Sequence, residues 1–358
     1  MAAARALLRY VHARAATQIA EPSDLLDTAR ELELEGALYA ALRRRGESDR
    51  IPATALEELR RVHVENAAHA MEVLRCTREL EEALRSAGVE MAPLKGVALL
   101  DAGVLPNPGI RFCLDLDVLT RPKDRERVRA VLERLGYASA GLGGAPKHLP
   151  EYRRGTMIVE VHEVAFWDRA GKKYGFDELA TERDPLAFTL VHLVHHLHVS
   201  SVTTPSLVAK TIGDVVAVLE DDRAPRVVER ARELALSVGL ERELDGLVSV
   251  VTSLIGGDLP DPGAEAVFAL CDSTSETEHA WRVIAYYARA ITTGPSWFRT
   301  ELLRAIFAPN STTSGSRATP TGRWRAAPRY AARSVQIAYR AVDRLSRAVI
   351  RDRTPRRR

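Results

Sequence analysis

The sequence predicts an α+β fold in which a small mixed sheet is flanked by N-terminal and C-terminal helical domains. Three observations predict it. Alanine, leucine, arginine and glutamate dominate the chain, and these residues favour helix. Residues 89–176 break the helical rhythm with short apolar runs separated by glycine and proline, as strands and turns do. Helical periodicity then returns at residue 177.

The first segment, residues 1–88, is expected to be helical. One helical pattern begins at Ser23, a good N-cap, and ends at Gly46. A longer pattern begins at Ala53 and ends at Gly88. Glycine often follows the last helical turn because it adopts the left-handed conformation easily.

The middle segment, residues 89–176, reads as a compact unit of four or five strands and two helices. The last two strands are expected to be connected by a turn near Gly155 and Thr156. The candidate elements, in chain order, are VEMAPLK as a strand, GVALLDAG as a helix, FCLDLDVLT as a strand, PKDRERVRAVLERLG as a helix, and EYRRGTMIVEVHEVAF as two strands.

Residues 177–308 are expected to form a C-terminal helical domain, followed by a flexible linker at 309–328 and a basic amphipathic tail at 329–358. The linker region is rich in serine, threonine, glycine and proline. From Arg323 to the end there are twelve arginines and two acidic residues. Because the whole chain has a net charge of +3, the residues before Arg323 carry a net negative charge. The tail is read as a solvated helix, as a contact to an anionic surface or nucleic acid, or as a docking helix for a protein partner.

The location expected for the protein is the cytoplasm. Its three cysteines are far apart in the chain and odd in number, which argues against a disulfide framework. The sequence has no uninterrupted run of about 18 apolar residues, so no transmembrane helix is predicted.

Two aspartates, Asp115 and Asp117, stand one residue apart in an apolar run. In a strand, residues i and i+2 face the same way, so the two carboxylates would repel unless a counter-ion joins them. Mg²⁺ is the natural counter-ion because it prefers oxygen ligands. The alternative is a solvated strand edge with no metal.

Glu160 lies in a second apolar run and would complete the metal site from a neighbouring antiparallel strand. Three carboxylates around two Mg²⁺ ions, for which Mn²⁺ could substitute, suit in-line attack on a phosphate. Lys95 and Gly96 lie at a strand-to-helix turn. A lysine charge, a close backbone approach at glycine and a helix N-terminus together suit a triphosphate.

The order of these motifs resembles the nucleotidyltransferase fold of the DNA polymerase beta superfamily. More narrowly, residues 20–220 resemble a bacterial group of nucleotidyltransferase family proteins. The shared elements are Leu94-Lys95-Gly96, Arg111, Asp115-Leu116-Asp117-Val118-Leu119, Gly136-Tyr137 and Val159-Glu160-Val161-His162. The chain departs from the wider superfamily in lacking the turn serine, in a longer gap before Asp115, and in carrying Glu160 where aspartate is more usual.

The resemblance implies an enzyme that transfers a nucleoside monophosphate from an NTP to a hydroxyl or phosphate acceptor and releases pyrophosphate. The acceptor would be a small molecule, a peptide or a saccharide, as in natural-product or polysaccharide biosynthesis. Asp115, Asp117 and Glu160 would be the catalytic metal ligands. The expected nucleotide-binding residues are Lys95, Gly96, Arg111, His195, Lys210 and Asp214.

Two other functions stay open on the sequence. One is a non-catalytic nucleotide-binding or scaffold protein on the same fold, and the other is an RNA-modifying toxin. A large RNA footprint is disfavoured because the body is acidic and lacks interleaved aromatic and basic residues. The spacing of His192 with His195 or His196 would suit a zinc pair, although no third ligand is evident and a structural role is the simpler interpretation.

Overall fold

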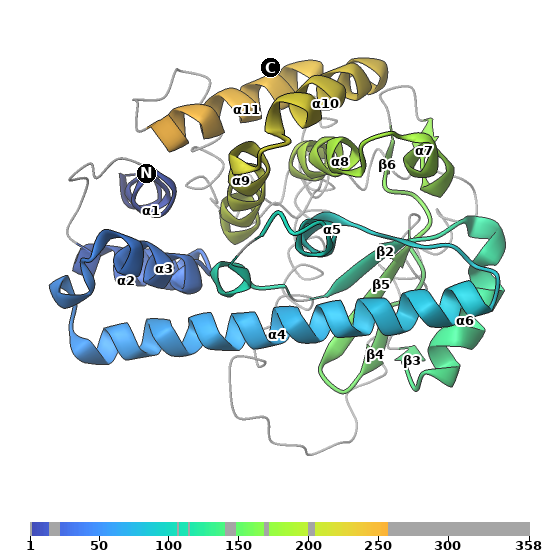
Figure 1. The fold of residues 1–358 in the computed structure, drawn as a ribbon, viewed down its shortest axis with the longest axis horizontal. Coiled ribbons are helices and arrows are strands. Elements are labelled where there is room, and N and C mark those ends of the chain that lie inside the picture. The colour runs from blue at the N-terminus through green and yellow to red at the C-terminus, as the bar shows by residue number, and fades with distance from the viewer. Residues whose placement is uncertain are drawn as a thin grey trace, which may run out of the picture. The chain divides into compact units, whose positions relative to one another are not determined.

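The computed structural model describes residues 2–13, 22–105, 107–113, 115–139, 148–167, 172–199 and 205–256. All of them fall in one compact unit, which comprises residues 1–199 and 203–273. The predicted linker, the basic tail and the last part of the predicted C-terminal helical domain lie outside the described residues. The α+β fold with flanking helices is confirmed (Figure 1).

The N-terminal helices are α1 (Ala2–His12), α2 (Leu26–Glu31), α3 (Glu35–Arg45) and the long α4 (Ala53–Ser86). The prediction of one continuous helix from Ser23 to Gly46 is wrong. Glu33 adopts a φ of 56°, which no α-helix permits, and the helix breaks there into α2 and α3. The predicted stop at Gly46 is confirmed by its left-handed φ of 68°.

The mixed sheet has five strands in the order β1-β2-β5-β4-β3. Its strands are β1 (Ala92–Pro93), β2 (Leu116–Leu119), β3 (Ala138–Ser139), β4 (Tyr152–Arg154) and β5 (Met157–His162). The β2–β5 pair is parallel and the other three pairs are antiparallel. Strands β6 (Phe166–Trp167) and β7 (Lys173–Tyr174) form a separate antiparallel pair.

Strand β2, which lies between β1 and β5, is shorter than the sequence predicts. The apolar run extends from residue 112 to 120, yet only Leu116–Leu119 pairs as a strand. Its neighbour β1 is two residues long and contains Pro93, which has no N–H to donate to a ladder. Because β2 begins at Leu116, Asp115 lies in a bend directly before the strand, and Asp117 lies within it.

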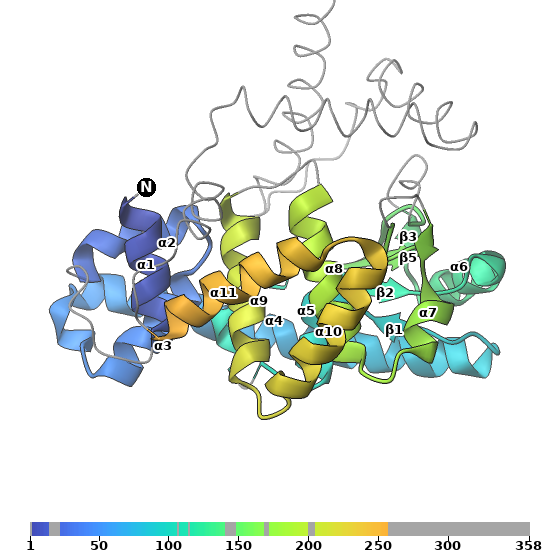
Figure 2. The same cartoon turned by 90° about the horizontal axis from the view of Figure 1, so that it is seen from above.

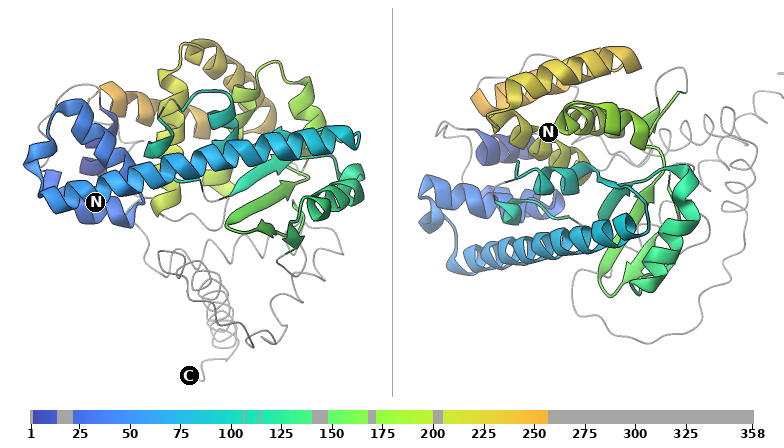
Figure 3. Two further views of the ribbon diagram at one scale, coloured as in Figure 1. Left: turned by 60° about the horizontal axis from the view of Figure 1, so that its bottom comes forward. Right: turned by 45° about the vertical axis from the view of Figure 1, so that its right-hand side comes forward.

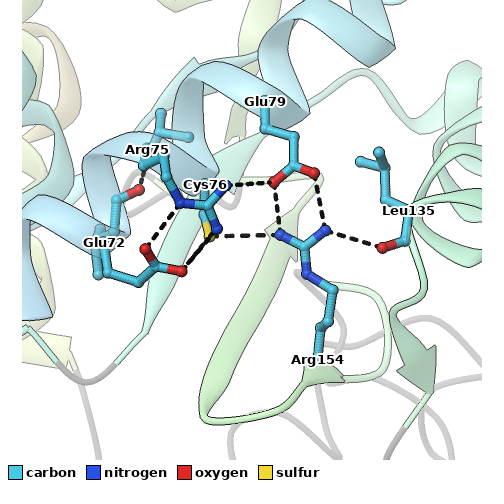
Figure 4. A network of polar contacts seen from close by, with 8 residues as sticks. Glu72, Arg75, Cys76, Glu79, Leu135 and Arg154 are labelled. Atoms are coloured by element: carbon cyan, nitrogen blue, oxygen red, sulfur yellow. Dashed lines mark hydrogen bonds and ion pairs between the residues drawn. The ribbon is translucent and has the colours of Figure 1, made fainter.

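Helices α5 (Lys95–Asp101) and α6 (Arg125–Arg134) follow β1 and β2. Helix α4 packs against α3 in its first half and against α6 near its other end, as both views of Figure 3 show. Figure 4 shows what joins α4 to the sheet: Glu79 accepts two hydrogen bonds from Arg154 of β4, at 2.6 and 2.9 Å. Arg154 also donates to the carbonyl of Leu135, at the end of α6.

The C-terminal helices lie together in front of α4 and α5 in the view of Figure 2. They are α7 (Phe176–Thr181), α8 (Pro185–Val199), α9 (Pro205–Glu220), α10 (Ala224–Val238) and α11 (Glu241–Gly256). Helix α8 packs against α5, and α1 packs against α9 and α11. The first and last described helices are therefore neighbours, and one continuous apolar core extends through all three predicted segments. The division at residues 88 and 176 stays a prediction.

No helix in the described part of the chain combines the length and the apolar character that a membrane span requires.

Candidate nucleotidyl-transfer site

The acidic site forms where β2 and β5 lie side by side. Asp117 and Glu160 are register partners in this pair, and their side chains therefore share one face of the sheet. The expectation that an antiparallel neighbour would deliver Glu160 is wrong, because the two strands run parallel. Helix α6 and strands β3 and β4 provide the long connection that parallel pairing needs.

A third ligand candidate, His162, joins this pair from the same strand as Glu160. Potential ligand atoms of Asp117, Glu160 and His162 all lie within 4.8 Å of one another. His162 Nε2 is 2.7 Å from Asp117 Oδ1 and 3.8 Å from Glu160 Oε2. His162 was not among the predicted metal ligands. Its position two residues after Glu160 was the available signal, since alternation places both side chains on one face.

Lys95 supplies the nearest cation. Its Nζ donates a 2.8 Å hydrogen bond to Asp117 Oδ1, so Lys95 and His162 approach the same carboxylate oxygen. Both side chains of the ion pair are largely buried, at 17% exposed for Lys95 and 5% for Asp117. Lys95 has a φ of 51°, a conformation that is unfavourable without glycine and that is often found at functional sites.

The surroundings of Asp117 and Asp115 shift the pKa values of these two carboxyl groups in opposite directions. Burial alone would raise the pKa of Asp117, yet Lys95 and His162 hold it well below its usual range. Burial and the charge of Asp117 raise the pKa of Asp115 to about 7. In the described part of the chain no hydrogen bond or ion pair reaches Asp115. Burial lowers the pKa of Lys95, and the nearby carboxylates more than reverse this effect, so its ammonium stays charged.

The residues of this acidic site fit a divalent cation. Carboxylate oxygens suit Mg²⁺ and Mn²⁺, and an imidazole nitrogen also suits the transition ions among these metals. Asp115 is not part of the tight group of ligand atoms, although its charge interacts with Asp117, Glu160 and Lys95. Asp117 and Glu160 would hold the ion, His162 adds a nitrogen to the same group, and Asp115 adds a further negative charge.

Gly96 and Arg111 form the wall beside Lys95. A Cβ on Gly96 would lie 2.2 Å from Cζ of Arg111, so only glycine accommodates the guanidinium there. In this structure the guanidinium lies against the turn, in the space that was predicted to hold a ligand. Helix α5 has seven residues, and the charge of Lys95 is therefore a stronger anion-binding feature than the helix terminus.

Arg111 is tied to the C-terminal helices through Asp214 of α9. Its Nε and Nη2 donate to the two carboxylate oxygens at 2.6 and 3.0 Å, and its Nη1 lies 2.9 Å from Cys113 Sγ. Asp214 is 1% exposed. Burial disfavours the charge of Arg111, but Asp214 more than compensates, and the pKa of Arg111 is raised. The arrangement makes Asp214 the anchor of Arg111.

The remaining two candidates have other neighbours. Lys210 of α9 pairs with Glu33, and its Nζ lies 5.6 Å from the ring centre of Phe112. His195 of α8 is 6% exposed and its ring centre is 5.6 Å from that of Phe166. Their nucleotide-binding roles stay predictions.

Residues 19–246 match the sequence model of a family described as uncharacterised nucleotidyltransferase. This chain belongs to that family. Membership in this nucleotidyltransferase family supports nucleotidyl transfer as the general activity and an NTP as the substrate. It also accords with a buried carboxylate group that could hold a divalent metal. Neither the curated proteins nor the solved structures contain a significant match to the chain.

Proposed function

We propose that this protein transfers a nucleoside monophosphate from an NTP to a hydroxyl or phosphate acceptor, with Mg²⁺ as the cofactor and pyrophosphate as the second product. The observation that supports this most strongly is the pairing of Asp117 and Glu160 on one face of two parallel strands, with Lys95 beside them. Carboxylates for a metal and a cation for phosphates are what phosphoryl-type transfer requires.

Each side chain has a distinct part in this proposal. Asp117 and Glu160 hold the divalent ions, with Asp115 as a further ligand, and His162 orients Asp117. When bound, the ions would polarise the α-phosphate and neutralise charge on the phosphate chain. Lys95 binds the phosphate oxygens. Arg111, held by Asp214, supports the Gly96 turn that carries Lys95.

For a hydroxyl acceptor, the proposed transfer forms one bond to the α-phosphorus and breaks another. Glu160, whose side chain is 27% exposed, accepts the proton of the acceptor hydroxyl. The acceptor oxygen forms a bond to the α-phosphorus, and the bond from that phosphorus to the bridging oxygen breaks. The electron pair leaves with pyrophosphate, whose charge Lys95 stabilises.

The first test is calorimetry with ATP, GTP, CTP and UTP, each with Mg²⁺, with Mn²⁺ or with a chelator. We expect at least one nucleotide to bind only when a metal is present, and Asp117→Asn to abolish this binding. Asp101→Asn is the matched control, since Asp101 is exposed at the end of α5. If no nucleotide binds with either metal, the proposal fails.

The second test looks for turnover. The protein is incubated with the α-labelled form of the bound nucleotide, Mg²⁺ and fractionated lysate as the acceptor source. Label transfer with release of pyrophosphate is expected. Nucleotide binding without transfer to any fraction would instead favour a non-catalytic nucleotide-binding or scaffold protein on this fold.

A further inference from the structure

The cation beside Asp117 belongs to the protein itself. Lys95 Nζ lies 2.8 Å from Asp117 Oδ1, and His162 Nε2 lies 2.7 Å from the same oxygen. We propose that Lys95 is an internal counter-ion that is exchanged between Asp117 and the triphosphate, so that metal and nucleotide bind this protein together and neither binds tightly alone. This inference rests on the proposed function.

Charge balance is the first argument. Asp115, Asp117 and Glu160 interact electrostatically with Lys95 in a buried environment. A divalent ion that enters this group alone must compete with an ammonium that already occupies one ligand oxygen, and the two cations repel each other. Lys95 thus lowers the affinity of the protein for free metal.

The same arrangement disfavours a nucleotide without metal. The phosphate chain would approach three carboxylates, while the lysine that should bind it remains engaged with Asp117. When metal and nucleotide arrive together, the metal compensates the carboxylates and Lys95 becomes available to the phosphate oxygens. Each ligand removes the obstacle to the other, which is positive coupling between the two binding events.

The backbone around Lys95 is held in place, so Lys95 can change from Asp117 to the phosphate by a movement of its side chain alone. The N–H of Leu94 donates to the carbonyl oxygen of Asp117 at 3.0 Å, so the residue before Lys95 is fixed to the residue that Lys95 neutralises. The left-handed φ of Lys95 also fixes the direction in which its side chain leaves the backbone. Lysine has a flexible four-carbon stem with a compact charge at its end, and it can change partner without rearrangement of the sheet.

The experiment uses the full chain after treatment with a chelator. Calorimetric titrations compare Mn²⁺ alone, each NTP alone, and each preformed Mn²⁺·NTP complex. The variants are Lys95→Met, which removes the charge, and Lys95→Arg, which keeps it. Lys123→Met is the matched control because Lys123 is an exposed lysine of the 3-10 helix Pro122–Asp124. Circular dichroism verifies that each variant is folded.

For the unchanged protein we expect tight binding of a preformed complex and weak binding of Mn²⁺ alone. Lys95→Met should bind Mn²⁺ alone at least about tenfold more tightly, within the range of ordinary coupling between sites, and should lose most of the enhancement that nucleotide gives. Lys95→Arg, which keeps a positive charge beside Asp117, should keep the weak binding of Mn²⁺ alone. Lys123→Met should resemble the unchanged protein. If Lys95→Met does not fold, Lys95→Gln takes its place with the same expectation.

The inference is overturned if the neutral variant binds Mn²⁺ alone no more tightly than the unchanged protein, while the preformed complex still binds to the latter. In that outcome the proposed function stands. If neither Mn²⁺ nor any complex binds to any of these proteins, the proposed function and this inference both fail.

Discussion

At the scale of single residues, the two aspartates of the DLD motif have different environments. Asp117 Oδ1 accepts a hydrogen bond from Lys95 and lies 2.7 Å from His162 Nε2. Asp115 has no such partner in the described part of the chain, and it lies near two other carboxylates. Their contributions to the stability of the metal-free protein should therefore have opposite signs.

We expect Asp115→Asn to raise the melting temperature of the metal-free protein. The pKa of Asp115 is raised to about 7 in the fold, above the value of about 3.9 in an unfolded chain. Ionisation of this group therefore destabilises the fold increasingly as pH rises from about 4 to 7. Scanning calorimetry at pH 5 and pH 7.5 should show a larger gain at the higher pH. An equal change at both values would contradict this assignment.

Asp117→Asn should lower the melting temperature under the same conditions. The change removes the carboxylate to which the buried ammonium of Lys95 donates its hydrogen bond, and breaking a buried pair costs on the order of 3 kcal/mol. Asp101→Asn serves again as the exposed control. A stable Asp117→Asn variant would show that the pair with Lys95 contributes little in the absence of metal.

Much of this site was predictable from residue types and spacing. Asp117, Glu160 and Lys95 do come together, because strand alternation and a strand-to-helix turn are local properties of the sequence. The pairing of Arg111 with Asp214 was not predictable, since the partners are separated by 103 positions. The position of His162 beside Asp117 could have been inferred from its spacing to Glu160, but a lone histidine in an apolar run carries little information of its own.

At the scale of elements, the pairing direction of β2 and β5 decides the geometry of the acidic site. Local sequence predicts the strands, and it does not predict whether two of them run parallel, because that depends on how the intervening chain packs. The break between α2 and α3 escaped prediction for a similar reason. The residues around Glu33 have ordinary helix propensity, and the packing of α2 and α3 on each other and on α1 accompanies the turn.

The element-scale prediction concerns the attachment of α9 to the loop before β2. Asp214→Asn should destabilise the protein by about 3–5 kcal/mol, since it removes the counter-charge of a buried arginine. Chemical denaturation measures this loss. Asp222→Asn is the control, because Asp222 is exposed just beyond α9. Additive effects of Asp214→Asn and Arg111→Met in a double-mutant cycle would contradict a direct energetic pair.

At the scale of the whole molecule, helices from both ends of the described chain pack against each other, since α1 contacts α9 and α11. The family match ends at residue 246 and the described residues end at 256. The predicted linker and basic tail lie beyond both limits. Composition alone therefore supports the expectation that the chemistry does not need them.

Truncation after Pro309 should leave a folded protein that still binds nucleotide with metal. The segment after it is rich in serine, threonine, glycine and proline, and few contacts are expected to cross such a sequence. The measurement is calorimetry with whichever NTP binds to the full chain in the presence of metal. Loss of binding in a soluble truncated protein would show that the tail belongs to the functional unit.

If the tail instead contacts an anionic surface, its removal should reduce binding to vesicles that contain anionic lipid. That difference should shrink as salt is raised, because exposed arginine charges are screened. Vesicle sedimentation at low and high salt measures it, with neutral vesicles as the control.

From the ion pair between Arg111 and Asp214 we also expect an order of folding events during translation. The strands that carry Asp117 and Glu160 leave the ribosome well before α9 does. Until Asp214 emerges, the guanidinium of Arg111 has no carboxylate to accompany it into the interior, and burial of an unpaired charge is unfavourable. We therefore expect the Lys95–Gly96 turn of the nascent chain to reach its final form only after α9 has been synthesised.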